Sequence, residues 1–71
     1  MNATKISVWR DETDGDDFWV VSADSEYSTR TLSTHSTYDA AIAAGHAQAA
    51  GRDLALVECD AGGEEMTIAV Y

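Results

Sequence analysis

The pattern of hydrophobic and polar residues in the first third of the chain predicts a β-hairpin. Residues Thr4 to Arg10 alternate, with Ile6 and Val8 on one side, as in a strand with one buried face. Residues Phe18 to Ala23 form an aromatic and β-branched run that favours a second strand. The stretch between them, Asp11 to Asp17, is polar and contains a glycine that can take positive φ, so we expect it to form the turn.

Three later segments also predict strands. Residues Tyr27 to Thr34 are rich in Thr and Ser and suit a strand at the edge of a sheet. Leu54 to Cys59 is a short apolar run that we expect to be largely buried, and Asp60 to Glu64 follows it as a turn with two glycines. Glu65 to Tyr71 alternates again and predicts a last strand. Its apolar side would consist of Met66, Ile68 and Val70.

One segment, Ser36 to Gly51, has the spacing and composition of a helix. Ser36 or Thr37 can cap its N-terminus through a hydroxyl group, and Asp39 follows at the capping-box spacing. Gly51 can end the helix in the left-handed conformation. The positions expected to face the sheet recur at spacings of three and four: Tyr38, Ala41, Ile42, Gly45 and Ala49.

The opposite side of this predicted helix carries alanines, where a surface helix usually carries Lys and Glu. These are Ala40, Ala43, Ala47 and Ala50. Alanine is the best helix former, so propensity alone explains them, and a smooth docking face for another protein is the alternative. Gly45 is expected to let the helix lie close to the sheet.

Together these segments predict a single α+β domain over residues 1–71, in the order βββαββ, with a mostly antiparallel sheet and one helix packed on one face. The other face of the sheet would then be uncovered. We expect it to carry Trp9, Trp19, Val21 and Ala23. Exposed aromatic residues there would indicate a protein interface and leave a homodimer open, whereas burial of one or both tryptophans in the core is the alternative.

Charge and composition restrict the class of partner. A formal net charge of −9 argues against direct binding to nucleic acid or an anionic membrane and points to basic partners. With 45% hydrophobic residues, the chain is too apolar for a disordered acidic tail. Cys59 is the only cysteine, and the sequence has neither an apolar signal segment nor a run long enough to span a bilayer. We therefore expect a cytoplasmic protein.

The predicted topology gathers acidic residues at one end of the domain. The turn after the first strand and the turn after the fourth strand should lie at the same end, because antiparallel hairpins reverse direction at each turn. Eight of the thirteen acidic residues would collect there and form the expected contact surface for a partner. These are Asp11, Glu12, Asp14, Asp16, Asp17, Asp60, Glu64 and Glu65.

Three explanations of this acidic end are open. Carboxylates on a rigid sheet can imitate the phosphates of duplex DNA and occupy the basic cleft of a nucleic-acid-binding protein. Adaptation to high salt would also produce many acidic residues with a single lysine, Lys5. Charged turns are also commonly just solvated.

Candidate catalytic and metal-binding residues are few. A calcium loop of the EF-hand type with the turn glycine at its sixth position would begin at Arg10 and end at Val21, which are unsuitable ligands, so only a loose calcium site at the turn stays open. The candidates for a nucleophile, a base or a soft-metal ligand are His35, His46 and Cys59. Their spacing matches no zinc motif, and a Cys59–His46 dyad would require hydrogen-bond contact. We expect no enzyme activity, no metal and no cofactor.

The chain resembles two groups of proteins. Its hairpin, the segment THSTYDAAIAAGHAQAA and the returning strand are similar to HicB-type antitoxins, which implies binding to a small toxic ribonuclease. In size, acidity and lack of catalytic residues, it resembles phage-encoded anti-CRISPR proteins, several of which act as DNA mimics. The second resemblance is one of type and assigns no residue.

These observations favour a non-enzymatic inhibitor that presents carboxylates to a basic, nucleic-acid-binding protein or complex, such as a CRISPR complex or another bacterial defence complex. The cytoplasm of a bacterial host is then the expected location. A HicB-like antitoxin, which would bind its partner through the helix or an open strand edge, is one alternative. A salt-adapted domain is the other.

Overall fold

The structure of the chain is a computed structural model that describes residues 3–13 and 15–71, with Thr13 described by its backbone alone. Five strands and one helix follow in the predicted order. They are β1 (Lys5–Thr13), β2 (Asp16–Asp24), β3 (Thr29–His35), α1 (Tyr38–Arg52), β4 (Ala55–Cys59) and β5 (Glu65–Val70). The βββαββ order expected from the sequence is confirmed.

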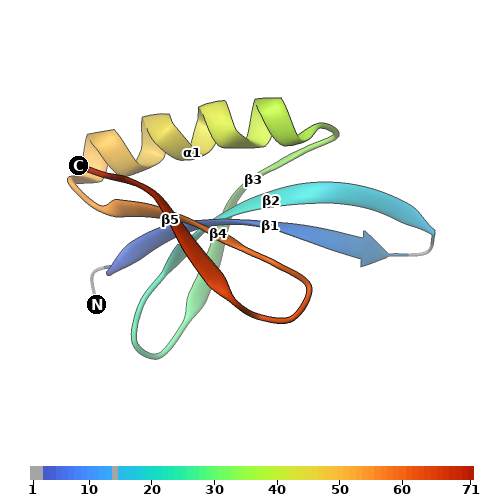
Figure 1. The fold of residues 1–71 in the computed structure, drawn as a ribbon, viewed down its shortest axis with the longest axis horizontal. Helices are drawn as coiled ribbons and strands as arrows, with labels where there is room; N and C mark the ends of the chain where they lie inside the picture. Colours follow the sequence, from blue (N-terminus) through green and yellow to red (C-terminus); the bar gives the residue numbers. More distant parts are fainter. Residues whose placement is uncertain (1–2, 14) are drawn as a thin grey trace.

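The five strands form one sheet in the order β3-β2-β1-β4-β5. Every neighbouring pair is antiparallel except β1 and β4, which run parallel because α1 connects β3 to β4 and returns the chain to the end where β1 starts. The helix lies along one face of the twisted sheet (Figure 1). The predicted α+β class and mostly antiparallel sheet are therefore confirmed.

The first hairpin is longer than the sequence predicts. The stretch Asp11 to Asp17, expected to be a turn, lies largely in strand, and the β1–β2 register extends to Glu12 opposite Asp17 and Thr13 opposite Asp16. Acidic residues have low strand propensity, so a prediction from propensity alone placed the ends of the two strands too early. Arg10 lies between Glu12 and Asp17 and forms ion pairs with both, which offsets their repulsion within the paired strands.

Each edge strand carries a register shift that turns an apolar residue toward the core. On β3 the shift skips Leu32, because Val21 pairs with Ser33 and Ser22 pairs with Thr31. On β5, Leu56 pairs with Ala69 and Val57 pairs with Thr67, so Ile68 between them has no partner residue. Both Leu32 and Ile68 pack against the core.

The shift in β5 contradicts the strict alternation expected for this strand. Met66 and Val70, predicted to share a face with Ile68, are 60% and 77% exposed. Ile68 and its neighbour Ala69 are the residues of β5 that pack against the core. The extra residue changes which side chains point inward, and the hydrophobic pattern alone does not reveal it.

The helix begins as expected and ends two residues later than expected. Thr37 is the N-cap, and its Oγ1 accepts a hydrogen bond from the backbone N–H of Ala40 at 3.2 Å. Asp53, not Gly51, takes the left-handed conformation after the last turn, with φ 55°, and its N–H bonds back to the helix. At 15 residues, α1 is the only helix in the described part of the chain, and it is too short to cross a bilayer.

The core lies between α1 and one face of the sheet. Its buried residues on the strands are Ile6, Val8, Val21, Ala23 and Leu56, and on the helix they are Ala41 and Ala49. Gly45 is buried between them, as predicted, because a Cβ there would stand 2.8 Å from Leu56 Cδ1 and 3.0 Å from Val8 Cγ2. The glycine brings the helix axis close enough for small side chains to fill the core.

The two tryptophans lie on opposite faces of the sheet, which corrects the expectation that both occupy the uncovered face. Trp19 pairs across the hairpin with Arg10 and packs against the core beneath the helix, and Val21 and Ala23 also face the helix. Trp9 pairs with Val20 on the other face. The run of apolar residues in β2 has no alternation, so the sequence did not indicate which of its residues face inward.

The face of the sheet opposite the helix was expected to be uncovered, but next to Trp9 it is closed to solvent, with Val20 buried beside a polar network. The Trp9 indole N–H donates to Ser22 Oγ at 3.1 Å, and the Ser22 hydroxyl donates to Asp24 Oδ1 at 2.9 Å. The Ser7 hydroxyl donates to the second carboxylate oxygen of Asp24. Ser7 and Ser22 are both buried, and this network satisfies their hydroxyl groups.

Candidate functional site

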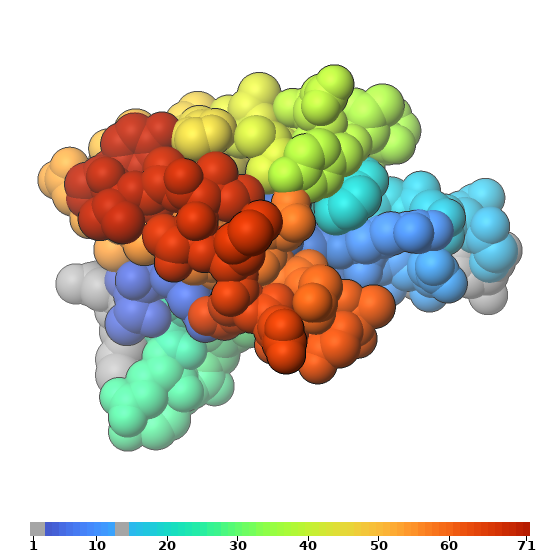
Figure 2. All heavy atoms as spheres, in the orientation of Figure 1, coloured from blue at the N-terminus to red at the C-terminus, as the bar shows by residue number. Residues whose placement is uncertain are grey.

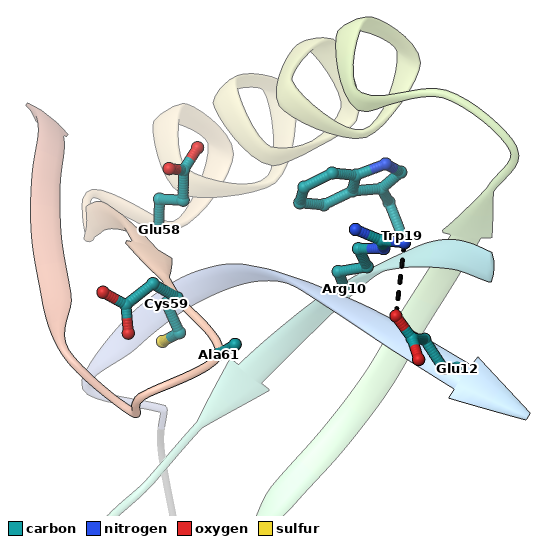
Figure 3. A pocket seen from close by; sticks show the side chains of 7 residues that line it. Arg10, Glu12, Trp19, Glu58, Cys59 and Ala61 are labelled. Carbon is teal, nitrogen blue, oxygen red and sulfur yellow. Dashed lines mark ion pairs between the residues drawn. The ribbon is translucent and has the colours of Figure 1, made fainter.

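A cleft of about 550 Å³ opens beside the β1–β2 hairpin, on the side of the sheet that faces the helix. β4 pairs with β1 from Lys5 to Val8, and β1 continues to Thr13 with no further partner on that side among the described residues. The space left beside this unpaired part of β1 forms the cleft. Its lining residues are Arg10, Glu12, Trp19, Glu58, Cys59, Asp60 and Ala61 (Figure 3).

The cleft joins the two turns that the sequence placed at one end of the domain. Because β1 and β4 are parallel, the chain leaves both strands at the same end. Glu12 from the first hairpin and Asp60 from the β4–β5 turn consequently line one cleft. Figure 2 shows the β4–β5 turn, in orange, beside the β1–β2 hairpin, in blue.

Two of the predicted contact carboxylates are held by Arg10. Its guanidinium group forms ion pairs with Glu12, at 3.2 Å from Oε1, and with Asp17. The side chains of all three residues are half exposed or more, so each pair stabilises the fold by no more than about 1 kcal/mol. Their main effect is to position the carboxylates along one face of the hairpin.

The other acidic residues of the hairpin do not join this group. Asp11 and Asp16 have the opposite strand parity from Glu12 and Asp17, so they lie on the face of the hairpin turned away from the helix. Asp14 was also predicted as a contact residue, and it lies outside the described residues. The acidic end of the domain thus carries carboxylates on two faces.

The β4–β5 turn is organised by Asp60. Its Oδ1 accepts hydrogen bonds from the backbone N–H groups of Gly62 and Glu64, both at 2.9 Å. Gly63 takes the positive φ of 83° that the turn requires. These bonds use only one oxygen of the Asp60 carboxylate and leave the Glu64 side chain exposed.

Glu65, the last of the predicted contact residues, is engaged within the chain. It forms an ion pair with Lys5, across the face of the sheet that the helix does not cover. Hydrogen bonding to the Glu65 carboxylate raises the pKa of Lys5 above its usual value. The only lysine of the chain is thereby paired with one of the eight acids.

The inner wall of the cleft is lined by Trp19, which the sequence indicated as an interface candidate, and by Glu58, which it did not indicate. The Trp19 and Tyr38 rings pack edge to face, with their centroids 5.0 Å apart and their planes at 72°. The pKa of the Tyr38 hydroxyl is raised, mainly by hydrogen bonding to the Glu58 carboxylate. Burial of Tyr38 and the nearby negative charge raise it further. Glu58 has the same strand parity as Leu56, and that was the available signal that its side chain turns toward the helix.

Glu58 carries the cleft's most unusual atom. Its Oε1 is buried and, within the described part of the chain, receives no hydrogen bond. No ion pair joins Glu58 to a cation among those residues either. Because this oxygen is closed to solvent, its neighbours are the groups packed around Glu58, among which is the Tyr38 hydroxyl.

Within the described residues, no hydrogen bond joins Cys59 to either histidine. His46 Nδ1 lies 2.5 Å from the Tyr71 hydroxyl, and His35 Nε2 lies 2.8 Å from Ser33 Oγ. Burial raises the pKa of the Cys59 thiol, which makes it a weaker nucleophile at neutral pH. Among residues 3–13 and 15–71, no three metal-ligating side chains come together.

Comparisons with protein-family models, with curated proteins and with solved structures found no match to this chain.

Proposed function

We propose that this protein is a non-enzymatic inhibitor that binds a basic, nucleic-acid-binding surface of another protein and acts there as a DNA mimic. The observation that supports this most is the convergence of Glu12 and Asp60, from two separate hairpins, on one cleft. Their strands belong to one hydrogen-bonded sheet, so the carboxylates have fixed positions relative to one another. A fixed array of negative charge is what a basic site evolved for phosphates would accept.

The net charge of −9 supports the same class of partner. Four carboxylates at this end form no ion pair within the described chain and are available to a partner: Asp11, Asp16, Asp60 and Glu64. The partner that we propose is a nucleic-acid-binding complex of bacterial defence, as the resemblance to anti-CRISPR proteins implies. Binding would take place in the bacterial cytoplasm.

Two double variants with the same change in charge test this proposal. Asp16→Asn with Glu64→Gln neutralises two exposed residues at the acidic end, and Glu26→Gln with Asp53→Asn neutralises two exposed residues at the opposite end. Tagged proteins are used to capture partners from a bacterial lysate that contains a CRISPR system, at low and high salt. Mass spectrometry identifies the captured proteins, and duplex DNA is added as a competitor.

We expect the wild type and the Glu26/Asp53 variant to capture a nucleic-acid-binding protein in a salt-sensitive manner, and DNA to displace it. The Asp16/Glu64 variant should capture about fivefold less, the combined effect of two exposed charges. Equal loss in both variants would mean that net charge acts without a defined site. Capture of nothing by the wild type, with a fold that forms only in molar salt by circular dichroism, would overturn the proposal in favour of a salt-adapted domain.

A further inference from the structure

The free edge of β5 exposes large apolar side chains. In the sheet order β3-β2-β1-β4-β5, one side of β5 pairs with β4, and the other side has no partner among the described residues. Met66 and Val70 are 60% and 77% exposed, and among the described strands only β5 has large apolar residues that are exposed. Figure 2 shows the end of β5, in red, at the surface. An unpaired edge flanked by exposed apolar side chains is a template for pairing with another strand.

The two exposed side chains lie on opposite faces of the sheet. Met66 pairs with Glu58, which has the parity of the face toward α1, whereas Val70 pairs with Ala55, which has the parity of the other face. In a regular strand, residues four apart share a face, and the register shift at Ile68 separates these two. A molecule docked on one face would therefore cover only one of them. A strand added along the free edge covers both, since its side chains flank β5 on each face.

β5 is fixed at both ends, so the free edge is already formed in the single chain. Glu65, at its start, forms an ion pair with Lys5 on β1. Just beyond its end, the Tyr71 hydroxyl lies 2.5 Å from Nδ1 of His46 on α1, and the two rings pack edge to face. Because the strand needs little further ordering when it pairs, the conformational entropy cost of association is small.

We propose that β5 pairs antiparallel with β5 of a second copy across a two-fold axis, which joins two five-stranded sheets into one. A strand edge is self-complementary in this arrangement, because each copy offers the same row of N–H and C=O groups. The charges favour a second copy over a basic partner strand, since Glu65 is the only charged residue of β5 and Lys5 already balances it. Antiparallel pairing places Glu65 of each copy near the Val70 end of the other, so the two acidic β4–β5 turns lie apart.

Sedimentation equilibrium over a range of protein concentrations tests this pairing. Val70→Glu and Met66→Glu each place a charge on one face of the proposed interface. Thr31→Glu is the matched control with the same change in charge. Thr31 is exposed on the other edge strand, β3, whose one large apolar residue packs against the core. Amide hydrogen exchange at low and high protein concentration identifies the strand edge that becomes protected.

We expect the wild type and Thr31→Glu to form dimers whose Kd values agree within about twofold. Each β5 variant should raise the Kd about tenfold or more, because pairing would bury a charge without a partner. Salt should strengthen the dimer, since it screens the repulsion between two chains of net charge −9. Among the strand edges, only β5 should gain amide protection as the concentration rises.

A monomer at every concentration, assemblies larger than a dimer, or protection gained at β3 would overturn this inference. Loss of the dimer in only one of the two β5 variants would also overturn it, because docking on a single face would give that result. Amide exchange in the wild type decides the question if a variant does not fold. The pairing is independent of the proposed function, in which salt weakens capture of the partner, so either can fail without the other.

Discussion

Gly45 on α1 lies directly over Leu56 on β4, so close that a Cβ on Gly45 would stand 2.8 Å from the Leu56 Cδ1. Leu56 is fully buried, so its side chain is enclosed by other residues of the core. The contact sets the distance between the helix and the sheet. It also lets a helix with alanine as its main core residue bury the apolar face of the sheet.

We expect Gly45→Ala to destabilise the fold. Alanine favours the helix by about 1 kcal/mol over glycine, but overpacking at Leu56 and Val8 costs about 1–3 kcal/mol, so the net loss should be about 1 kcal/mol. Chemical denaturation followed by circular dichroism measures the free energy of unfolding.

Gly51→Ala is the matched control for this substitution. Gly51 also lies in α1, and a Cβ there meets no atom of the described chain within 4 Å. This variant should stabilise the fold by about 0.5 kcal/mol, because only helix propensity changes. If both variants stabilise the protein, the helix can move away from Leu56 at no cost.

The pKa of Tyr38 provides a test of its contact with Glu58. Hydrogen bonding to Glu58, burial and the nearby negative charge all raise this pKa above the ordinary tyrosine value of about 10. Glu58→Gln should lower it toward that value. Carbon-13 NMR of labelled tyrosine measures this pKa, and Tyr38→Phe assigns the Tyr38 signal among those of the three tyrosines.

The same shift determines the sign of the effect on stability. The folded protein holds the Tyr38 proton more tightly than the unfolded chain does. The stabilising contribution is thus fully present below about pH 10 and is lost as the pH rises through the folded-state pKa. Wild type should lose more stability in this alkaline range than Glu58→Gln. An equal loss would show that the contact does not persist in solution.

The sequence predicted the order of elements because each has a local cause. Thr37 caps the helix through its own hydroxyl, and the spacing of Ala41, Gly45 and Ala49 produces one buried face. The end of the helix was harder to locate. Asp53 takes the left-handed conformation that is usual for glycine, and no feature of the neighbouring sequence marks this aspartate as the end of a helix.

The candidate site was harder to predict than the order of elements, because it depends on which strands pair and not only on the hydrophobic pattern. The sequence brought Glu12 and Asp60 to one end, and the parallel pairing of β1 with β4 places them on one cleft. The division of Glu12 and Asp11 between two faces follows from strand pairing that continues through an acidic segment, against its propensity. Trp19 could not be assigned to a face because its neighbours in β2 are also apolar.

Cys59 should react slowly with iodoacetamide at neutral pH. Burial raises the pKa of its thiol, so little of it is thiolate at neutral pH. Mass spectrometry measures the rate in folded protein, and the rate in denaturant is the reference. Alkylation of the folded protein at the denatured rate would contradict the burial of this thiol.

The Trp9–Ser22 hydrogen bond should stabilise the face of the sheet opposite the helix. Ser22 is fully buried and connects the Trp9 indole to Asp24, so Ser22→Ala leaves the indole N–H and one carboxylate oxygen without this partner. We expect a loss of about 1–3 kcal/mol in the free energy of unfolding. Trp9→Phe removes the same donor and keeps an aromatic ring in its place.

A double-mutant cycle on these two residues isolates their interaction. In the Trp9→Phe background there is no indole N–H to lose its acceptor. Ser22→Ala should therefore lower the free energy of unfolding less than it does in the wild type. The difference, the coupling energy, should be about 0.5–1.5 kcal/mol, the net value of one hydrogen bond. Additive losses would indicate that water replaces Ser22 as the acceptor. Trp9 would then keep its place on this face without the hydrogen bond that joins it to the network ending at Asp24.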